Sequence, residues 1–220
     1  MRGILMKKVQ LSYGDYYDER LMKPIRKQEE CVLLILELLN ILLIGEVVGN
    51  EKGLIMIIVD KMSRLFCFSD NKYFSMVFPF DIDTTEGKNI TYRIYDPILD
   101  IEIDNRLIAL MKRMLNQIDF VKNTIDEIIE KAYFDVSSEE YTEGEVEKCF
   151  NIILRLLSME TGYIRYDYDP DHENGTLHPL YHFDVNYSSK GTYKMGINKK
   201  MEKEDFVDLL DIKTKCHYIL

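Results

Sequence analysis

Two short segments near the C-terminus alternate strictly between apolar and polar residues, and they limit the fold more than any other feature of the chain. In residues 163–168 and 181–187, every second residue is isoleucine, valine, phenylalanine or tyrosine. Because successive side chains of a strand point to opposite faces, such a segment has one apolar and one polar face. The pattern therefore predicts two neighbouring antiparallel strands, with Tyr166 and Phe183 on the core side.

The polar faces of these two strands carry the residue types that a catalytic site needs. The first strand contributes Arg165 and Asp167, and the second contributes His182 and Asp184. Directly opposed residues of paired strands have Cβ atoms about 5 Å apart, so the four side chains fall within reach of one another. If the protein is an enzyme, we expect His182 and Asp184 to carry the chemistry. Asp167 would be the second carboxylate, and Arg165 would orient an anion.

The same pattern has an interpretation without catalysis. An antiparallel sheet with one solvated face commonly carries cross-strand Arg–Asp and His–Asp pairs. Both interpretations predict the same pairing of the two strands. They differ in whether the polar face forms a cleft or lies open to solvent.

The histidines of this region also suggest metal ligands. His178 and His182 are an even number of residues apart, so an extended segment places both on one face, together with Asp184. Imidazole and carboxylate groups can hold a divalent ion such as Mg²⁺ or Mn²⁺, which would activate water. We therefore expect His178, His182 and Asp184 as metal ligands. Lys194, on a third predicted strand over residues 192–197, continues the polar face and could hold a phosphate.

Residues 105–133 have the clearest helical periodicity of the chain. Apolar residues recur at alternating steps of four and three from Leu107 to Ala132, which is the spacing of a heptad seam. The pattern predicts one helix over residues 106–132, about 40 Å long. Its seam can pack inside the chain, or it can form a homodimer or a contact with a protein partner.

The remaining periodic segments define the fold class. Further helices are expected at residues 21–44, 143–159 and 202–210. Short strand-like runs separated by turn-forming residues are expected at 54–60, 64–68, 73–78, 90–95 and 98–103. This order predicts an α+β fold in which antiparallel sheets pack with long helices. We expect a single domain of residues 1–220, with a sub-division into 1–104 (helix plus β-meander) and 105–220 (helical pair plus C-terminal sheet).

The charge and the absence of several motifs narrow the range of possible functions. The net charge of −10 argues against a protein built mainly to grip duplex DNA, although metal ions can bring positive charge to an acidic nuclease site. Neither a phosphate-binding glycine motif nor a metalloprotease or serine-hydrolase motif is present. The four cysteines form no C-x-x-C pair, which is typical of free thiols in a reducing cytoplasm.

No membrane association is expected. The strongest apolar run, residues 31–48, is interrupted by Glu37 and Asn40 and falls short of the roughly 20 residues that a membrane span requires. The N-terminal residues lack the apolar core and cleavage site of a signal peptide. We therefore expect a cytoplasmic protein in which residues 31–48 belong to a buried helix.

The C-terminal signature resembles one found in other proteins. Arg165-x-Asp167, followed by His178-Pro179 and His182, is similar to an R-x-D…H-P-x-x-H pattern of uncharacterised prokaryotic domains, over about residues 160–215. Those domains are associated with toxin–antitoxin or phage-defence contexts. The resemblance implies a cytoplasmic effector of a prokaryotic defence or toxin-type system, with metal-dependent action on nucleic acid or nucleotide. The alternative is a non-catalytic interaction subunit of such a system.

Overall fold

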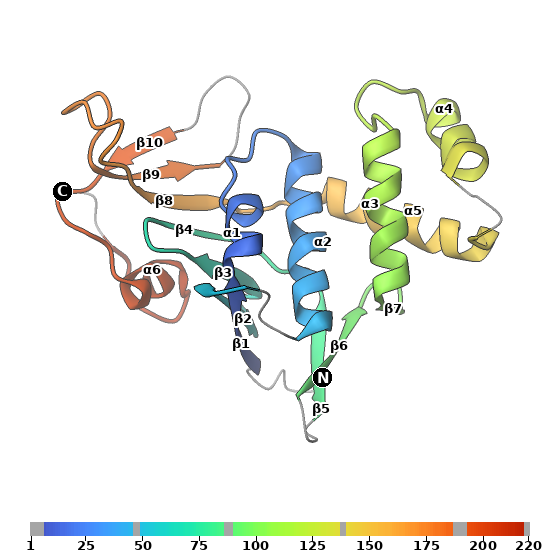
Figure 1. The fold of residues 1–220 in the computed structure, drawn as a ribbon, viewed down its shortest axis with the longest axis horizontal. Helices are drawn as coiled ribbons and strands as arrows, with labels where there is room; N and C mark the ends of the chain where they lie inside the picture. Colours follow the sequence, from blue (N-terminus) through green and yellow to red (C-terminus); the bar gives the residue numbers. More distant parts are fainter. Residues whose placement is uncertain (1–6, 46–48, 86–89, 137–139, 187–192, 218–220) are drawn as a thin grey trace. The chain divides into compact units, whose positions relative to one another are not determined.

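The computed structural model describes residues 7–45, 49–85, 90–136, 140–186 and 193–217 (Figure 1). Within these residues the chain forms two compact units, each assembled from separate segments. The sheet unit takes Met1–Lys27, Glu46–Phe78 and Glu160–Leu220. The helical unit takes Gln28–Gly45 and Pro79–Met159.

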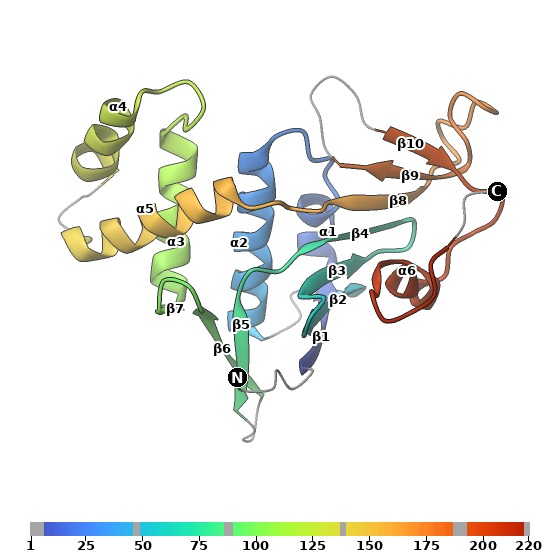
Figure 2. The same cartoon turned by 180° about the vertical axis from the view of Figure 1, so that it is seen from behind.

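A seven-stranded antiparallel sheet forms the centre of the sheet unit (Figures 1 and 2). In spatial order its strands are β1 (Lys7–Gly14), β2 (Glu51–Val59), β3 (Arg64–Phe68), β4 (Lys72–Val77), β8 (Ile164–Tyr168), β9 (Tyr181–Val185) and β10 (Tyr193–Gly196). Helices α1 (Asp15–Leu21) and α6 (Lys203–Leu210) complete the unit. The N-terminal and C-terminal strands join where β4 pairs with β8. One sheet therefore spans residues that the expected sub-division after residue 104 had separated.

An aromatic core covers one face of this sheet. Tyr166 of β8 lies opposite Phe183 of β9, and both side chains are buried. The ring of Phe206 from α6 packs edge-on against Phe66 and Phe68 of β3, an arrangement that aromatic pairs favour. The predicted antiparallel pairing of the two alternating segments, and the predicted core positions of Tyr166 and Phe183, are confirmed.

The helical unit contains a second sheet and the remaining helices. Its three antiparallel strands are β5 (Asp81–Thr85), β6 (Thr91–Asp96) and β7 (Ile101–Ile103). Its helices are α2 (Gln28–Ile44), α3 (Asn105–Gln117), α4 (Ile125–Glu130) and α5 (Glu143–Ser158), with a π-helical turn η1 (Lys131–Val136) after α4. α2 contacts α3, α5 and β6. The α+β fold with antiparallel sheets is confirmed, although no described helix exceeds the 17 residues of α2.

The single long helix predicted over residues 106–132 is wrong, because a loop of residues 118–124 separates α3 from α4. The carboxylate of Asp119 accepts hydrogen bonds from the backbone N–H groups of Val121 and Lys122, at 3.1 and 2.9 Å. Such side-chain bonds offer the backbone an alternative to the helical i→i−4 bonds. They interrupt the helix although the apolar periodicity continues.

A capping box then starts α4 as a new helix. The hydroxyl of Thr124 accepts from the N–H of Glu127, and the Glu127 carboxylate accepts from the N–H of Thr124. The break divides the seam. Met114 and Ile118 are buried within the chain, whereas Val121 and Ile125 are 76% and 74% exposed.

Other differences lie at element ends. α2 begins at Gln28 rather than at residue 21, and the preceding residues include the separate helix α1 and the connection 22–27. Strands β1 and β5 are additional to the predicted ones. Among the helices of the described ranges, none combines the length and apolar character needed to cross a membrane.

A buried ion pair links α5 to β6 within the helical unit. Arg155 donates to Oδ2 of the fully buried Asp96 at 2.7 Å through Nε and at 2.5 Å through Nη2. The other carboxylate oxygen of Asp96 accepts from the N–H groups of Ile98 and Leu99. Removing one member of such a pair leaves a buried charge uncompensated.

We therefore expect Asp96→Ala to lower the free energy of unfolding of the helical unit by about 3–5 kcal/mol. Chemical denaturation followed by circular dichroism measures this loss. Glu102→Ala is the matched control, because Glu102 pairs with Arg93 at an exposed position where ion pairs contribute little. Equal losses in the two variants would contradict a special role for the buried pair.

Candidate functional site

The strand register brings the four predicted catalytic residues to one place. Arg165 lies opposite Asp184, and Asp167 lies opposite His182, at the centre of the β8–β9 pair. Strands β4 and β10 flank this pair on either side. The side chains are buried rather than solvated, with exposed fractions of 9% for Arg165, 3% for Asp167, 1% for His182 and 6% for Asp184.

The polar face is therefore neither the open wet face nor the solvent-filled cleft that the sequence suggested. Alternation identifies which residues share a face, but it does not say whether that face meets water. An enclosed polar face must satisfy its charges internally, because burying an unpaired charge costs several kcal/mol.

Arg165 satisfies most of this requirement. Its Nε and Nη2 donate to Oδ2 of Asp167 at 3.0 and 2.6 Å, and Nη2 also donates to Oδ2 of Asp184 at 2.7 Å. Burial alone would lower the pKa of the guanidinium, but the charge of Asp167 and its other acidic neighbours outweigh burial and raise that pKa. Arg165 is thus fully charged and committed to the two carboxylates.

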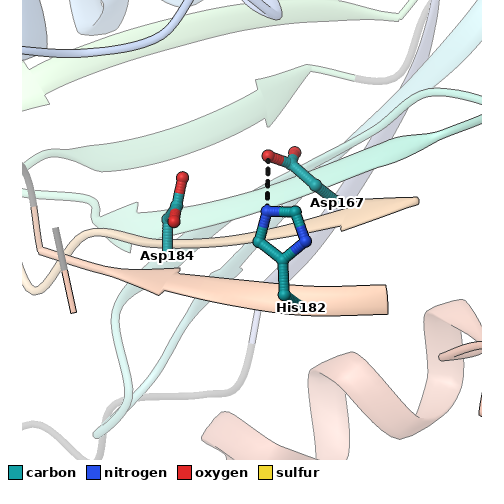
Figure 3. Close-up of side chains that lie close together, drawn as sticks. All are labelled: Asp167, His182 and Asp184. Atoms are coloured by element: carbon teal, nitrogen blue, oxygen red, sulfur yellow. Dashed lines mark ion pairs between the residues drawn. The ribbon is translucent and has the colours of Figure 1, made fainter. Parts of the chain in front are cut away.

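His182 is fixed by a backbone carbonyl. Its Nδ1 lies 2.9 Å from the carbonyl oxygen of Pro179. A carbonyl only accepts hydrogen bonds, so Nδ1 must carry a proton and donate it. In the neutral imidazole the other nitrogen, Nε2, then holds a lone pair. Figure 3 shows this nitrogen facing the carboxylate of Asp167, with a separation of 3.7 Å between Nε2 and Oδ2.

A positive charge between two lone-pair groups that face each other would stabilise the arrangement. The 3.7 Å separation is too long for an N–H···O hydrogen bond. It is close to the separation of about 3.4 Å between two ligands of a tetrahedral metal with bonds of about 2.1 Å. Metal-bound histidines typically donate their other ring N–H to a backbone carbonyl, as His182 does to Pro179. The ring is therefore oriented as a metal ligand would be.

Ligand atoms of Asp167, His182 and Asp184 all lie within 4.8 Å of one another. Among the described residues, Oδ1 of Asp167 is buried without a hydrogen-bond partner. A buried oxygen with no partner is costly and suggests a ligand that completes it. The donor set of one imidazole and two carboxylates suits a divalent metal ion.

Two occupants fit the charge of this group. A proton on Nε2 of His182 would bring the sum of guanidinium, imidazolium and two carboxylates to zero. A divalent metal ion beside neutral His182 would bring the sum to +1, because Arg165 contributes +1, the carboxylates −2 and the ion +2. The metal-bound state would then attract an anion, such as hydroxide or a phosphate ester.

The expected metal ligands differ in one member. The structure groups Asp167 with His182 and Asp184, where the sequence suggested His178. The His178 ring lies edge-on to the His182 ring, with centroids 4.6 Å apart, and its Nε2 is 3.8 Å from Oδ2 of Asp169. His178 therefore neighbours the three-ligand group but points toward another carboxylate.

Asp169 and His172 lie beside the site and were not among the predicted site residues. Asp169 follows β8, and its Oδ1 accepts from Nδ1 of His172 at 2.9 Å. Burial works to raise the pKa of Asp169, but the hydrogen bond and charge of His172 outweigh it and lower the pKa. The Asp169-x-x-His172 spacing before a tight turn was the available signal. Lys194 is in register with Asp184, and its side chain lies outside the described part of the structure.

No family model, curated protein or solved structure matches the chain. The resemblance to prokaryotic defence-associated domains therefore stays a prediction.

The arrangement predicts a large cost for removing Arg165. Arg165→Met would leave two carboxylates buried without a counter-charge, and we expect the free energy of unfolding to fall by about 3–5 kcal/mol. Urea denaturation at pH 7 measures the change. Lys52→Met, which removes a cation from an exposed pair with Asp70 in the same unit, is the control and should change stability little. If Arg165→Met were as stable as this control, the ionic network would not stabilise the sheet.

Proposed function

We propose that this protein is a divalent-metal-dependent effector of a prokaryotic defence or toxin-type system, acting on phosphate esters of nucleic acid or nucleotides. Its metal would be held by Asp167, His182 and Asp184. The observation that supports this most is the orientation of His182, whose Nδ1 faces a carbonyl and whose Nε2 faces a carboxylate beyond hydrogen-bond distance.

Each residue of the group has a role in this proposal. His182 is a ligand held in one tautomer by Pro179, and Asp167 and Asp184 are the anionic ligands. Arg165 is a positioning residue that holds both carboxylates in place, since its N–H groups already bond to them. It therefore does not orient a substrate anion, the role suggested by the sequence.

A divalent ion in this site would lower the pKa of a coordinated water and supply a hydroxide for attack on phosphorus. The net charge of +1 in the metal-bound group suits an anionic substrate. An imidazole ligand favours Mn²⁺ or Zn²⁺ over Mg²⁺, which prefers oxygen ligands only. Because the four side chains are at most 9% exposed, hydrolysis also requires a conformation that admits a phosphate ester to this face.

The first test of the proposal is metal binding. At a metal concentration 100 times the dissociation constant, a single site raises the free energy of unfolding by about 2.7 kcal/mol. We expect Mn²⁺ or Zn²⁺ to produce such a stabilisation in thermal melts, together with a stoichiometry near one by titration calorimetry. His182→Gln should abolish both effects, and His217→Gln, at an exposed histidine paired with Asp208, should preserve them.

The same variants then test chemistry. With metal supplied, the wild-type chain should hydrolyse nucleic acid or nucleotide phosphate esters, and folded His182→Gln and Asp184→Asn should be inactive. If the wild type binds no metal, the proposed metal centre is wrong and the ionic group has a structural role only. Full activity in both folded variants would place any catalysis elsewhere.

A second candidate function, the non-catalytic interaction subunit, is favoured by exposed apolar residues in the helical unit. Val121 lies in the loop before α4 and Ile125 is the first residue of α4, and both are mostly exposed. Ile129, one turn further along α4, is also exposed. The first half of the predicted heptad seam is buried within the chain, so this shorter stretch is what remains for a partner.

We expect this stretch to make a contact between protein chains, with a second copy as the simplest partner. Light scattering on Val121→Asp/Ile125→Asp should then show a smaller oligomer than the wild type. Ile212→Asp, at an exposed isoleucine in the sheet unit, is the control and should leave the oligomeric state unchanged. A monomeric wild type at micromolar concentration would rule out the homodimer.

A further inference from the structure

Strand β10 lies beside His182 on the side away from Asp167, and the residue that faces His182 there has no side chain. His182 is opposite Gly196 in the β9–β10 register, as it is opposite Asp167 in the β8–β9 register. Directly opposed residues of neighbouring strands present their side chains on the same face. A side chain at position 196 would therefore stand on the polar face, next to the imidazole. Gly196 leaves that place open.

The ring of Pro179 occupies this place. A Cβ atom added to Gly196 would lie 2.9 Å from Cγ and 3.3 Å from Cβ of Pro179. Carbon atoms in favourable contact are about 3.5–4.0 Å apart, so an alanine at position 196 would displace the ring. A glycine inside a strand often marks such a close approach of another segment. Gly196 thus admits Pro179 to the face on which His182 lies.

The backbone that follows Pro179 has little room to yield, because hydrogen bonds hold it on both sides. The N–H of Asp169, at the end of β8, donates to the carbonyl of Leu180 at 3.0 Å. The N–H of Ile197, directly after β10, donates to the carbonyl of Tyr181 at 3.0 Å. A displacement of the Pro179 ring would therefore act on its own carbonyl group, which precedes these two fixed carbonyls.

The position of the Pro179 carbonyl decides what the imidazole of His182 can bind. Nδ1 of His182 donates to this carbonyl at 2.9 Å. If the carbonyl moved out of hydrogen-bond range, the buried Nδ1–H would lose its acceptor, which is costly. The neutral ring would then be more stable with its proton on Nε2, where the carboxylate of Asp167 faces it. In that form Nε2 no longer offers a lone pair to a metal ion.

We propose that Gly196 is a positioning residue of the candidate site. By admitting the ring of Pro179, it places the Pro179 carbonyl at Nδ1 of His182 and keeps the Nε2 lone pair directed toward Asp167. The effect on metal binding rests on the proposed function. The hydrogen bond between His182 and Pro179 does not, so it is measured separately in the metal-free protein.

The experiment compares the full-length wild type with Gly196→Ala by NMR and by metal titration. In the metal-free wild type we expect a slowly exchanging Nδ1–H signal from His182. Gly196→Ala should speed its exchange with water by about tenfold, the scale of one hydrogen bond, while the backbone amides of β9 exchange as in the wild type. The same variant should weaken Zn²⁺ binding by about 10–100-fold, as losing the partner of a metal-bound histidine does.

Two further variants separate the Pro179 contact from other effects of an added methyl group. Gly144→Ala is the matched control in α5, because a Cβ at this position meets none of the described atoms within 4 Å. It should leave both measurements unchanged. The double variant Pro179→Ala/Gly196→Ala keeps the backbone carbonyl but removes the Cγ atom of the ring. It should recover most of the protection of the His182 Nδ1–H, and a failure to do so would contradict the role of the ring.

The remaining outcomes distinguish this inference from the proposed function. If Gly196→Ala matches Gly144→Ala in both measurements, Gly196 does not position His182, while the metal centre stands. If the β9 amides lose as much protection as Nδ1–H, the substitution loosens the strand in general and the positioning role is wrong. A wild type with a protected Nδ1–H that binds no Zn²⁺ would remove the metal centre and leave the hydrogen-bond role of Gly196 in place.

Discussion

The hydrogen bonds from Arg165 to Asp167 and Asp184 are the interaction on which the C-terminal half of the sheet depends. The carboxylates of Asp167 and Asp184 are buried on adjacent strands, with oxygens within 4.8 Å of each other. At an effective dielectric constant of 20, they would repel each other by about 3 kcal/mol. The guanidinium of Arg165 donates to both carboxylates, offsets this repulsion and links β8 to β9. The same hydrogen bonds help to specify the register of the two strands. A slip of one residue in β9 would move His182 and Asp184 to the aromatic face, against Tyr166 and Phe206.

The hydrogen bonds of Arg165 also affect the candidate site. Because Arg165 holds the Oδ2 atoms of both carboxylates, the two carboxylates of the proposed metal site are positioned before any ion would bind. A preorganised site of this kind avoids the cost of ordering its ligands during binding. The same bonds reduce the free negative charge that would attract an ion. A site built in this way gains selectivity for ions that also bind imidazole, since its carboxylates alone are already partly neutralised.

The sequence predicted the strand pair and its faces well, because alternation is a strictly local rule. Tyr166, Phe183, Arg165 and Asp184 all occupy the predicted faces. It did not predict that the polar face is enclosed, because burial depends on segments distant in the sequence. The prediction of one helix over residues 106–132 failed because local hydrogen bonds override the apolar spacing. At residues 118–124 the apolar spacing persists, yet the local hydrogen bonds of Asp119 and Thr124 end one helix and begin another.

The alternation predicted the four residues of the candidate site. It did not predict that Asp167, and not His178, groups with His182 and Asp184. His178 lies in the connection between β8 and β9. Its ring packs against His182, but its Nε2 faces Asp169, and the path of this connection is not visible in the local alternation. The joining of β4 to β8 was also beyond the local pattern, because more than 80 residues separate these strands in sequence.

That pairing of β4 with β8 has a consequence for synthesis on the ribosome. The first four strands are complete once residue 77 has emerged, yet the strand that covers the edge of β4 begins only at Ile164. In the interval, the nascent chain presents a row of unpaired backbone groups along Lys72–Val77, a segment rich in apolar and aromatic residues. Such an edge readily pairs with the same edge of another nascent chain. Until Ile164 emerges, the edge of β4 therefore stays open to pairing with another chain.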